Sequence, residues 1–123
     1  MNTELHTPVI KQYLEIKARH KNSFVFFRMG DFYELFFEDA VKASEILNLT
    51  LTKRGKSGGE HVLLAGVPVH SSNRYIKTLL ARGKTIAICE QVEDSKPGKG
   101  LVKREVVRIL TSGTIYEEEL IDD

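Results

Sequence analysis

The sequence predicts a single α/β (α+β) domain: a mixed β-sheet of about five strands with flanking helices, in the order α-β-α-β-β-α-β-β. Three observations carry this prediction. The length of 123 residues suits one domain with a hydrophobic core. Short runs rich in aromatic and β-branched residues alternate with longer segments in which apolar residues recur every three or four positions. No internal repeat or low-complexity tract interrupts this pattern, so helices packed on one sheet are the simplest arrangement.

The first half of the chain is expected to alternate helix, strand and helix. A helix is predicted from Pro8, which follows the N-cap residue Thr7, to about His20. The run 23–29, SFVFFRM, is apolar on both faces and predicts a central strand. The next apolar residues lie four, three and four positions apart, and this spacing predicts a helix over 32–47.

The second half is expected to hold the other four strands, one helix and two basic loops. The helix is predicted over 73–82, because Ser71 or Ser72 can cap its start and Gly83 can close its end. The strands are predicted at 48–52, 62–69, 84–92 and 104–110, and the loops at 53–61 and 93–100.

The composition is that of an ordinary globular protein, with 41% hydrophobic and 28% charged residues. No apolar run approaches the roughly 20 residues of a membrane-spanning helix. The first residues lack the basic start and apolar middle of a signal peptide. The single Cys89 cannot form an internal disulfide and has no neighbouring metal ligands, so we expect a buried, reduced thiol in a cytosolic protein.

The charge distribution is asymmetric, although the net charge is only +1. The last ten residues hold five acids and no base; without them, 18 basic residues face 12 acidic ones, a net charge of +6 for residues 1–113. We therefore expect a domain over 1–113 and an acidic exit segment or linker over 114–123, leading toward a following domain absent from this chain. A basic body favours a polyanionic partner, although on charge alone two solvated basic loops are the more ordinary explanation.

Enzyme motifs do not fit this sequence. The tripeptide Gly83–Thr85 resembles the end of a phosphate-binding loop, but residue 78 is Thr instead of Gly, and the predicted order is helix to strand. Two acid-x-Lys triplets, at Glu15–Lys17 and Asp94–Lys96, are expected on a helix and in a loop, whereas a metal-dependent nuclease needs them on a strand. The four histidines lack metal-ligand spacing. The chain is therefore expected not to be an enzyme.

The stretch GDFYELF, from Gly30 to Phe36, poses the main question of function. An aromatic pair four residues apart, here Phe32 and Phe36, is typical of a helix face packed in a core. However, Phe32 also falls where the chain leaves the strand, with Glu34 two residues on. An exposed aromatic there could push between DNA base steps, and a carboxyl group beside it could hydrogen-bond a base. The residues alone leave both interpretations open.

Five segments together decide between these interpretations: FVFFRMGDFYELFFEDA, LNLTLTKRG, AGVPVHS, AICEQVED and REVVRILTSGT. In this order and spacing, they closely resemble the N-terminal mismatch-recognition domain of the bacterial MutS family, over nearly the whole chain. The most specific motif is the Phe-x-Glu within GDFYE. MutS-like relatives that act in recombination and ignore mismatches tend to lack it, so they are the weaker alternative.

The resemblance implies a role for each residue of this motif. Phe32 matches the phenylalanine that inserts from the minor groove and stacks on a mispaired or unpaired base. Glu34 matches the glutamate that hydrogen-bonds that base. Tyr33 and Arg28 are expected to be structural.

Further DNA contacts are also implied by the resemblance. Met29 and Arg54 match positions near the DNA, and Lys53 and Lys56 are expected to contact phosphates from the same loop. His70, in GVPVH, fits either the core or a DNA contact.

The partners implied by the family are double-stranded DNA with a mismatch or unpaired base, the remaining MutS domains, a second MutS subunit and MutL. A cytoplasmic, nucleoid-associated location is expected, without a membrane. No metal or cofactor is expected in this domain, because the family's ATPase, with its ATP and Mg²⁺, lies in later domains.

Overall fold

The sheet is mixed, as predicted, but within the described residues it has six strands instead of about five. The computed structural model describes residues 6–93 and 101–114. The strand order is β3-β4-β2-β1-β5-β6, and β1 pairs with β5 in parallel while the other neighbours are antiparallel. The strands are β1 (Phe24–Met29), β2 (Phe32–Phe36), β3 (Thr52–Ser57), β4 (Glu60–Pro68), β5 (Ile86–Gln91) and β6 (Arg104–Leu110).

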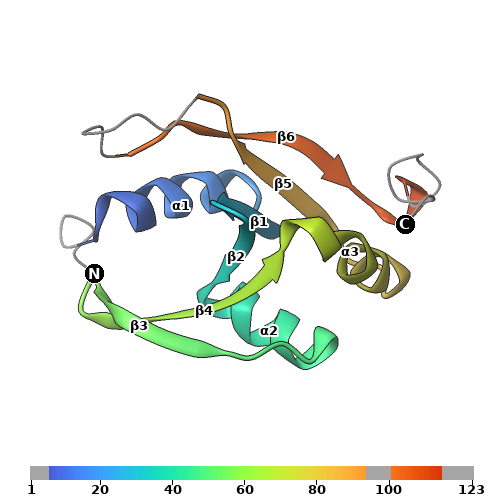
Figure 1. The fold of residues 1–123 in the computed structure, drawn as a ribbon, viewed down its shortest axis with the longest axis horizontal. Helices are drawn as coiled ribbons and strands as arrows, with labels where there is room; N and C mark the ends of the chain where they lie inside the picture. Colours follow the sequence, from blue (N-terminus) through green and yellow to red (C-terminus); the bar gives the residue numbers. More distant parts are fainter. Residues whose placement is uncertain (1–5, 94–100, 115–123) are drawn as a thin grey trace.

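In the part of the chain that the structure describes, three α-helices cover the two faces of this sheet (Figure 1). They are α1 (Pro8–Arg19), α2 (Phe37–Leu47) and α3 (Ser72–Ala81). One buried cluster joins α1 to side chains such as Val25, Phe27 and Ala87. The other joins α2 and α3 to the opposite face, where Phe26 and Leu35 are fully buried. Consecutive side chains of a strand point to opposite faces, and β1 is apolar on both faces. It therefore contributes side chains to both clusters, as expected of a central strand.

Several sequence predictions are confirmed in detail. Thr7 is the N-cap of α1 and accepts a hydrogen bond from the Ile10 backbone N–H, with Pro8 in the first turn. Gly83 follows the C-cap residue of α3. Cys89 is a buried free thiol, and burial raises its pKa to about 11, so it stays protonated at neutral pH.

The prediction of a helix over 32–47 is wrong in its first third. Residues Phe32–Phe36 form β2, which pairs with both β1 and β4, and α2 begins only at Phe37. The cause is a two-residue turn between the paired residues Met29 and Phe32. Its first residue, Gly30, has φ +62°, a left-handed value that glycine adopts without strain and that a type II′ hairpin turn requires there.

The predicted strand 48–52 and loop 53–61 are also displaced. The strand β3 starts at Thr52 and runs through the basic residues to Ser57, and β4 begins at Glu60. Gly58 and Gly59 both have positive φ and form the two-residue turn of a hairpin. Because β3 is an edge strand with exposed side chains, it carries little of the apolar signal by which strands are predicted.

A buried carboxylate ties α2 to α1 and β1. Asp39 is 7% exposed and accepts hydrogen bonds from the Lys17 ammonium at 3.0 and 3.1 Å and from the Val25 backbone N–H at 3.0 Å. The Tyr13 hydroxyl lies 3.5 Å away, and its burial, together with this carboxylate, raises the pKa of that hydroxyl. These partners satisfy a charge that would otherwise be costly to bury.

Three stretches of the sequence lie outside the described residues. They are residues 1–5, most of the second basic loop, at 94–100, and most of the acidic exit segment, at 115–123. None of the helices in residues 6–93 and 101–114 is both long and apolar enough to cross a membrane.

Candidate nucleic-acid interface

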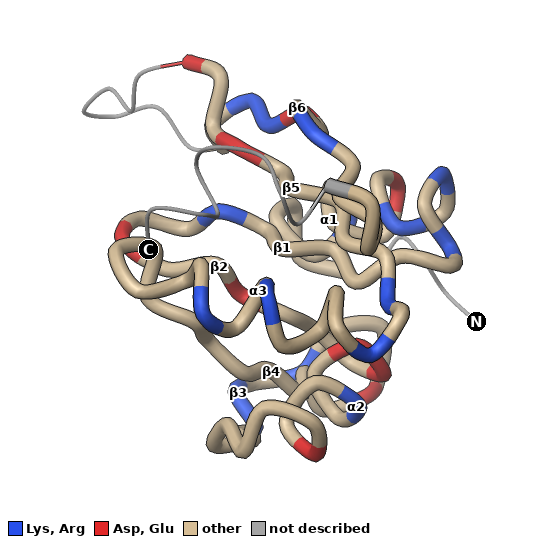
Figure 2. The backbone as a smooth tube through the Cα atoms, turned by 90° about the vertical axis from the view of Figure 1, so that its right-hand side faces the viewer, with Lys and Arg blue, Asp and Glu red and all other residues tan. Residues whose placement is uncertain are grey.

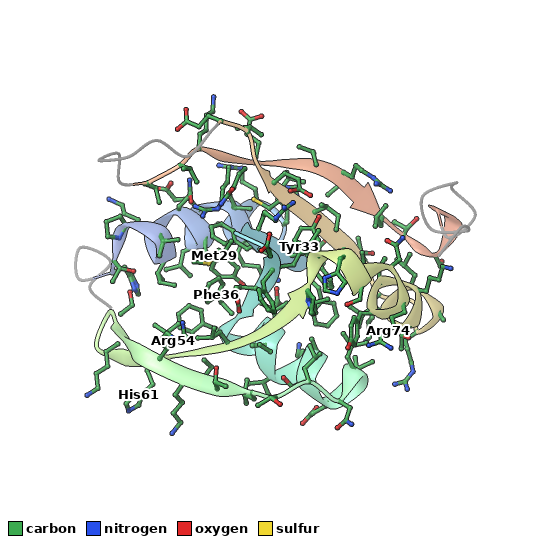
Figure 3. The ribbon with its side chains drawn as sticks, in the orientation of Figure 1. Met29, Tyr33, Phe36, Arg54, His61 and Arg74 are labelled. Atoms are coloured by element: carbon green, nitrogen blue, oxygen red, sulfur yellow. The ribbon has the colours of Figure 1, made fainter. Side chains whose placement is uncertain are left out.

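The strand geometry of β2 separates Phe32 and Glu34 from Tyr33. The Phe32 ring is 43% exposed, Glu34 is half-buried on the same face, and Tyr33 is 6% exposed on the opposite face. The Tyr33 side chain lies toward β5 (Figure 3), where its hydroxyl donates to the Glu90 carboxylate. Arg28 pairs with the same carboxylate at 2.9 Å. Tyr33 and Arg28 therefore hold the hairpin to β5, and the exposed ring belongs to Phe32.

Phe32 and Glu34 line an open groove of about 610 Å³. One wall comes from β3 and β4, with Thr52, Arg54 and Gly66, and Tyr75 of α3 adds a second aromatic side chain. The remaining lining residues are Asn48, Leu49, Thr50 and Leu64. The groove thus combines two aromatic rings, one carboxyl group and one guanidinium.

The Glu34 carboxyl group lies in an unfavourable environment for its charge. Burial raises its pKa, and the nearby Arg54 guanidinium opposes that shift. Its Oε1 atom is buried and has no hydrogen-bond partner among the described residues. Buried polar atoms are nearly always paired in folded proteins, so an unpaired one in a side chain that lines a groove makes that side chain a candidate for contact with a ligand.

Gly66 leaves room for both side chains. It lies opposite Glu34 in the β2–β4 ladder. A Cβ atom at this position would lie 3.1 Å from Glu34 Oε2 and 3.2 Å from Phe32 Cδ2, closer than ordinary van der Waals contact. The glycine therefore permits a close approach of β4 to the two candidate side chains.

A β-bulge brings Arg54 beside Glu34. The pairing of β3 with β4 shifts register between Lys53 and Lys56, so Arg54 lies in the irregular part of the strand. Bulges are common beside functional sites because they redirect a side chain. Arg54 lines the groove and also a neighbouring cavity of about 240 Å³, which Met29, Glu34 and Lys56 share.

The predicted DNA-contact residues therefore divide into two sets. Figure 3 shows Met29 and Arg54 in the space between α1 and the β3–β4 hairpin, and both line the cavity of about 240 Å³ beside the groove. Lys53 is exposed on β3 and lines neither hollow. His70 is exposed and lines a shallow hollow with Phe32 and Pro68, so it is not a core residue.

Sequence reasoning missed Gly66 and Tyr75. A glycine within a predicted strand signals close approach of another group, and this signal was present in VLLAGVPV. Tyr75 carries no comparable local signal, because only the packing of α3 brings it to the groove. Arg74 lies over the Tyr75 ring, with its guanidinium carbon 4.9 Å from the ring centroid. The described residues hold no group of three or more His, Cys, Asp or Glu side chains placed to bind a metal ion.

The fold and the groove define a class: an α/β domain that presents an exposed aromatic ring and a carboxyl group beside a basic edge strand. Sequence comparison identifies the family. The family model described as MutS domain I matches residues 7–119, so the chain belongs to the MutS family as its domain I.

Proteins named DNA mismatch repair protein MutS are among its similar relatives. The one from Halalkalibacterium halodurans is 60% identical over 117 residues, which cover 95% of this chain and 13% of the relative. Those from Oceanobacillus iheyensis and Shouchella clausii are each 53% identical, covering 95% and 96% of this chain and 14% and 13% of the relatives. The chain thus spans about one seventh of the length of the curated relatives it matches.

Proposed function

We propose that this domain binds duplex DNA in mismatch repair and senses base mismatches and small insertion or deletion loops by inserting Phe32 from the minor groove. The observation that carries the proposal is the exposed Phe32 ring on a paired strand, beside a half-buried carboxyl group with an unpaired oxygen. The membership of MutS domain I and the names of the relatives support the DNA-repair role.

Phe32 suits a wedge because its backbone is fixed while its ring is free. It pairs with Met29 on β1 and with Pro68 on β4, so the strand on which it lies is held from both sides. An apolar ring held in this way can enter between base steps without ordering a loop first. The deformation costs least where a base is mispaired or unpaired, which gives specificity for a defect instead of a sequence.

Glu34 would contact the base, and the basic side chains of β3 would contact the DNA backbone. The Glu34 carboxyl group lines the groove and can hydrogen-bond the edge of the base on which Phe32 stacks. Burial raises the pKa of this carboxyl group, and the nearby Arg54 guanidinium opposes that shift. Arg54, Lys53 and Lys56 are all exposed on β3 and would contact the phosphate backbone, which positions the domain without reading sequence.

In the whole protein, this domain would be the non-catalytic part that touches DNA. ATP hydrolysis with Mg²⁺, the second subunit and the MutL partner would act through other parts of a chain roughly seven times longer, as the coverage of the relatives indicates. DNA binding in mismatch repair would take place at the nucleoid in the cytoplasm.

Fluorescence anisotropy tests the proposal with two labelled duplexes, one with an unpaired T and one fully paired, at low salt. The chain should prefer the defect, and Phe32→Ala should remove stacking worth about 1–3 kcal/mol, a loss of roughly 5- to 150-fold on the defective duplex. Ile109→Ala is the matched control, because this side chain is 44% exposed on β6. Circular dichroism confirms that each variant is folded.

Three outcomes would count against the proposal. Equal affinity of the unaltered chain for both duplexes would refute sensing by this domain alone. Preference for the defect retained in Phe32→Ala would refute the wedge. An unfolded Phe32→Ala variant would show that the ring is needed for the core.

A further inference from the structure

A second polar hollow, of about 220 Å³, lies at the end of β1 opposite the groove. Phe24 at the start of β1 lines it, whereas Met29 at the far end pairs with Phe32, and five strand steps separate these ends by roughly 17 Å. The lining comes from four parts of the chain: Lys17, Lys21, Asn22, Ser23, Phe24, Asp39, Lys42 and Lys84. Four of these eight residues are lysines.

The charge of one lysine is already balanced. The Lys17 ammonium lies 3.0 Å from Asp39 Oδ1 and donates at 2.6 Å to the Ser23 carbonyl oxygen. The Asp39 carboxylate in turn accepts hydrogen bonds from the Lys17 ammonium, the Val25 N–H and the Tyr13 hydroxyl. This pair therefore contributes almost no net charge to the hollow, and it fixes the wall from which the other lysines extend.

The other three lysines leave the hollow positive. Lys21 and Lys84 are exposed and pair with no carboxylate among the described residues. Among the described residues, Lys42 pairs only with Glu38, at 3.8 Å, and because both side chains are more than half exposed, this surface pair contributes little. Figure 2 shows blue segments gathered on this side, at the turn after α1, ahead of β5 and on α2. The fold thus brings like charges from distant parts of the sequence together. Their mutual repulsion favours an anion bound in the hollow over the empty hollow.

The hollow has the donors and the size for one small anion. Ammonium groups, the Asn22 amide and the Ser23 hydroxyl can all donate to phosphate oxygens, and charged donors make the stronger bonds. At about 220 Å³ the hollow is smaller than the roughly 300–1,000 Å³ typical of sites for larger organic ligands. A single phosphate group fits this chemistry better than a whole nucleotide.

We propose that this hollow is a phosphate-binding site, separate from the groove of Phe32, in which Lys21, Lys42 and Lys84 hold one phosphate group. Lys84 belongs to the Gly83–Thr85 tripeptide, which follows α3 and precedes β5 and so cannot act as a phosphate-binding loop. Here it contributes a side-chain charge instead of backbone amides. The phosphate comes either from a small phosphate compound or from a nucleic-acid backbone, and the proposal does not depend on mismatch sensing.

The test is an NMR titration of the ¹⁵N-labelled chain with inorganic phosphate, compared with sodium chloride at equal ionic strength. Phosphate should shift the backbone amide signals of Asn22, Ser23 and Lys84 saturably, and chloride should not. Lys21→Gln/Lys84→Gln should weaken this binding at least roughly tenfold. Lys11→Gln/Lys77→Gln is the control, because it removes the same charge from α1 and α3 outside the hollow.

A second arm distinguishes the two sources of phosphate. The salt dependence of binding to a fully paired duplex is measured for both double variants. If DNA supplies the phosphate, the slope of log K against log salt falls by about 1 for the lost contact in the hollow variant, but not in the control. An unchanged slope with saturable phosphate binding points to a small phosphate compound. Equal shifts in phosphate and chloride, or equal weakening in both double variants, would overturn the proposal.

Discussion

Glu34→Gln is expected to stabilise the domain at neutral pH. The carboxyl group is half-buried, its Oε1 atom has no partner among the described residues, and burial raises its pKa. Glu34→Gln leaves an unpaired buried atom in place and changes only the charge, so the gain, after partial exposure and the lost attraction of Arg54 are discounted, should be about 1 kcal/mol or less. The neutral amide removes the charge and keeps the shape.

The stabilisation by Glu34→Gln should increase as the pH rises. Because the folded state holds its proton more tightly, the carboxyl group is least harmful below the ordinary glutamate pKa of 4.5. The free energy of unfolding of the unaltered chain should then fall, relative to the variant, as the pH rises from 4.5 through the raised folded pKa. The gap should be absent at low pH and largest at neutral pH.

Urea denaturation followed by circular dichroism at a series of pH values measures this gap. Glu45→Gln is the matched control, since Glu45 is exposed on α2 and its change should stay within about 0.5 kcal/mol. A less stable Glu34→Gln at neutral pH, or a gap that does not change with pH, would refute the reasoning. Either result would mean that the carboxylate has a stabilising partner in the folded state.

Two further substitutions test the packing around the groove and under α1. Gly66→Ala should reduce the preference for mismatched DNA in anisotropy assays and lower the free energy of unfolding by about 1 kcal/mol, because its Cβ would lie 3.2 Å from the Phe32 ring. Gly113→Ala is the control: its nearest contact would be 3.7 Å away, so it should have neither effect. Asp39→Asn should lower the free energy of unfolding by roughly 3 kcal/mol in urea, since it leaves the Lys17 ammonium without its charge partner. A loss below about 1 kcal/mol would show that water replaces Asp39.

Much of the fold could be predicted because the core elements carry strong local signals. The helix α1 has an N-cap, an N-terminal proline and an apolar stripe, and β1 and β5 each begin with four consecutive apolar residues. The errors fall where these signals are ambiguous. An apolar pair at positions 32 and 36 lies on one face of a strand and also on one face of a helix, so spacing alone could not separate β2 from α2.

The turn signal could have resolved that ambiguity. Gly30-Asp31 between two apolar runs is a dipeptide typical of a two-residue hairpin turn. Prediction of the candidate site is limited in a similar way, because local sequence patterns do not show which distant segments meet. Phe32 and Glu34 are predicted through family resemblance, while the residues of β4 and α3 that line the groove with them are far away in the sequence. Gly66 and Tyr75 meet them only once the sheet is assembled.

The strand at 32–36 changes the physical argument for Phe32 itself. On a helix start, the ring would lie one turn from Phe36 and share its core environment. On β2, the two rings lie on one face but at opposite ends of the strand, and their exposures are 43% and 4%. The short turn at Gly30 ends the sheet there, so no further residue of the hairpin covers Phe32. The exposed ring is therefore a direct consequence of the hairpin that the helical prediction missed.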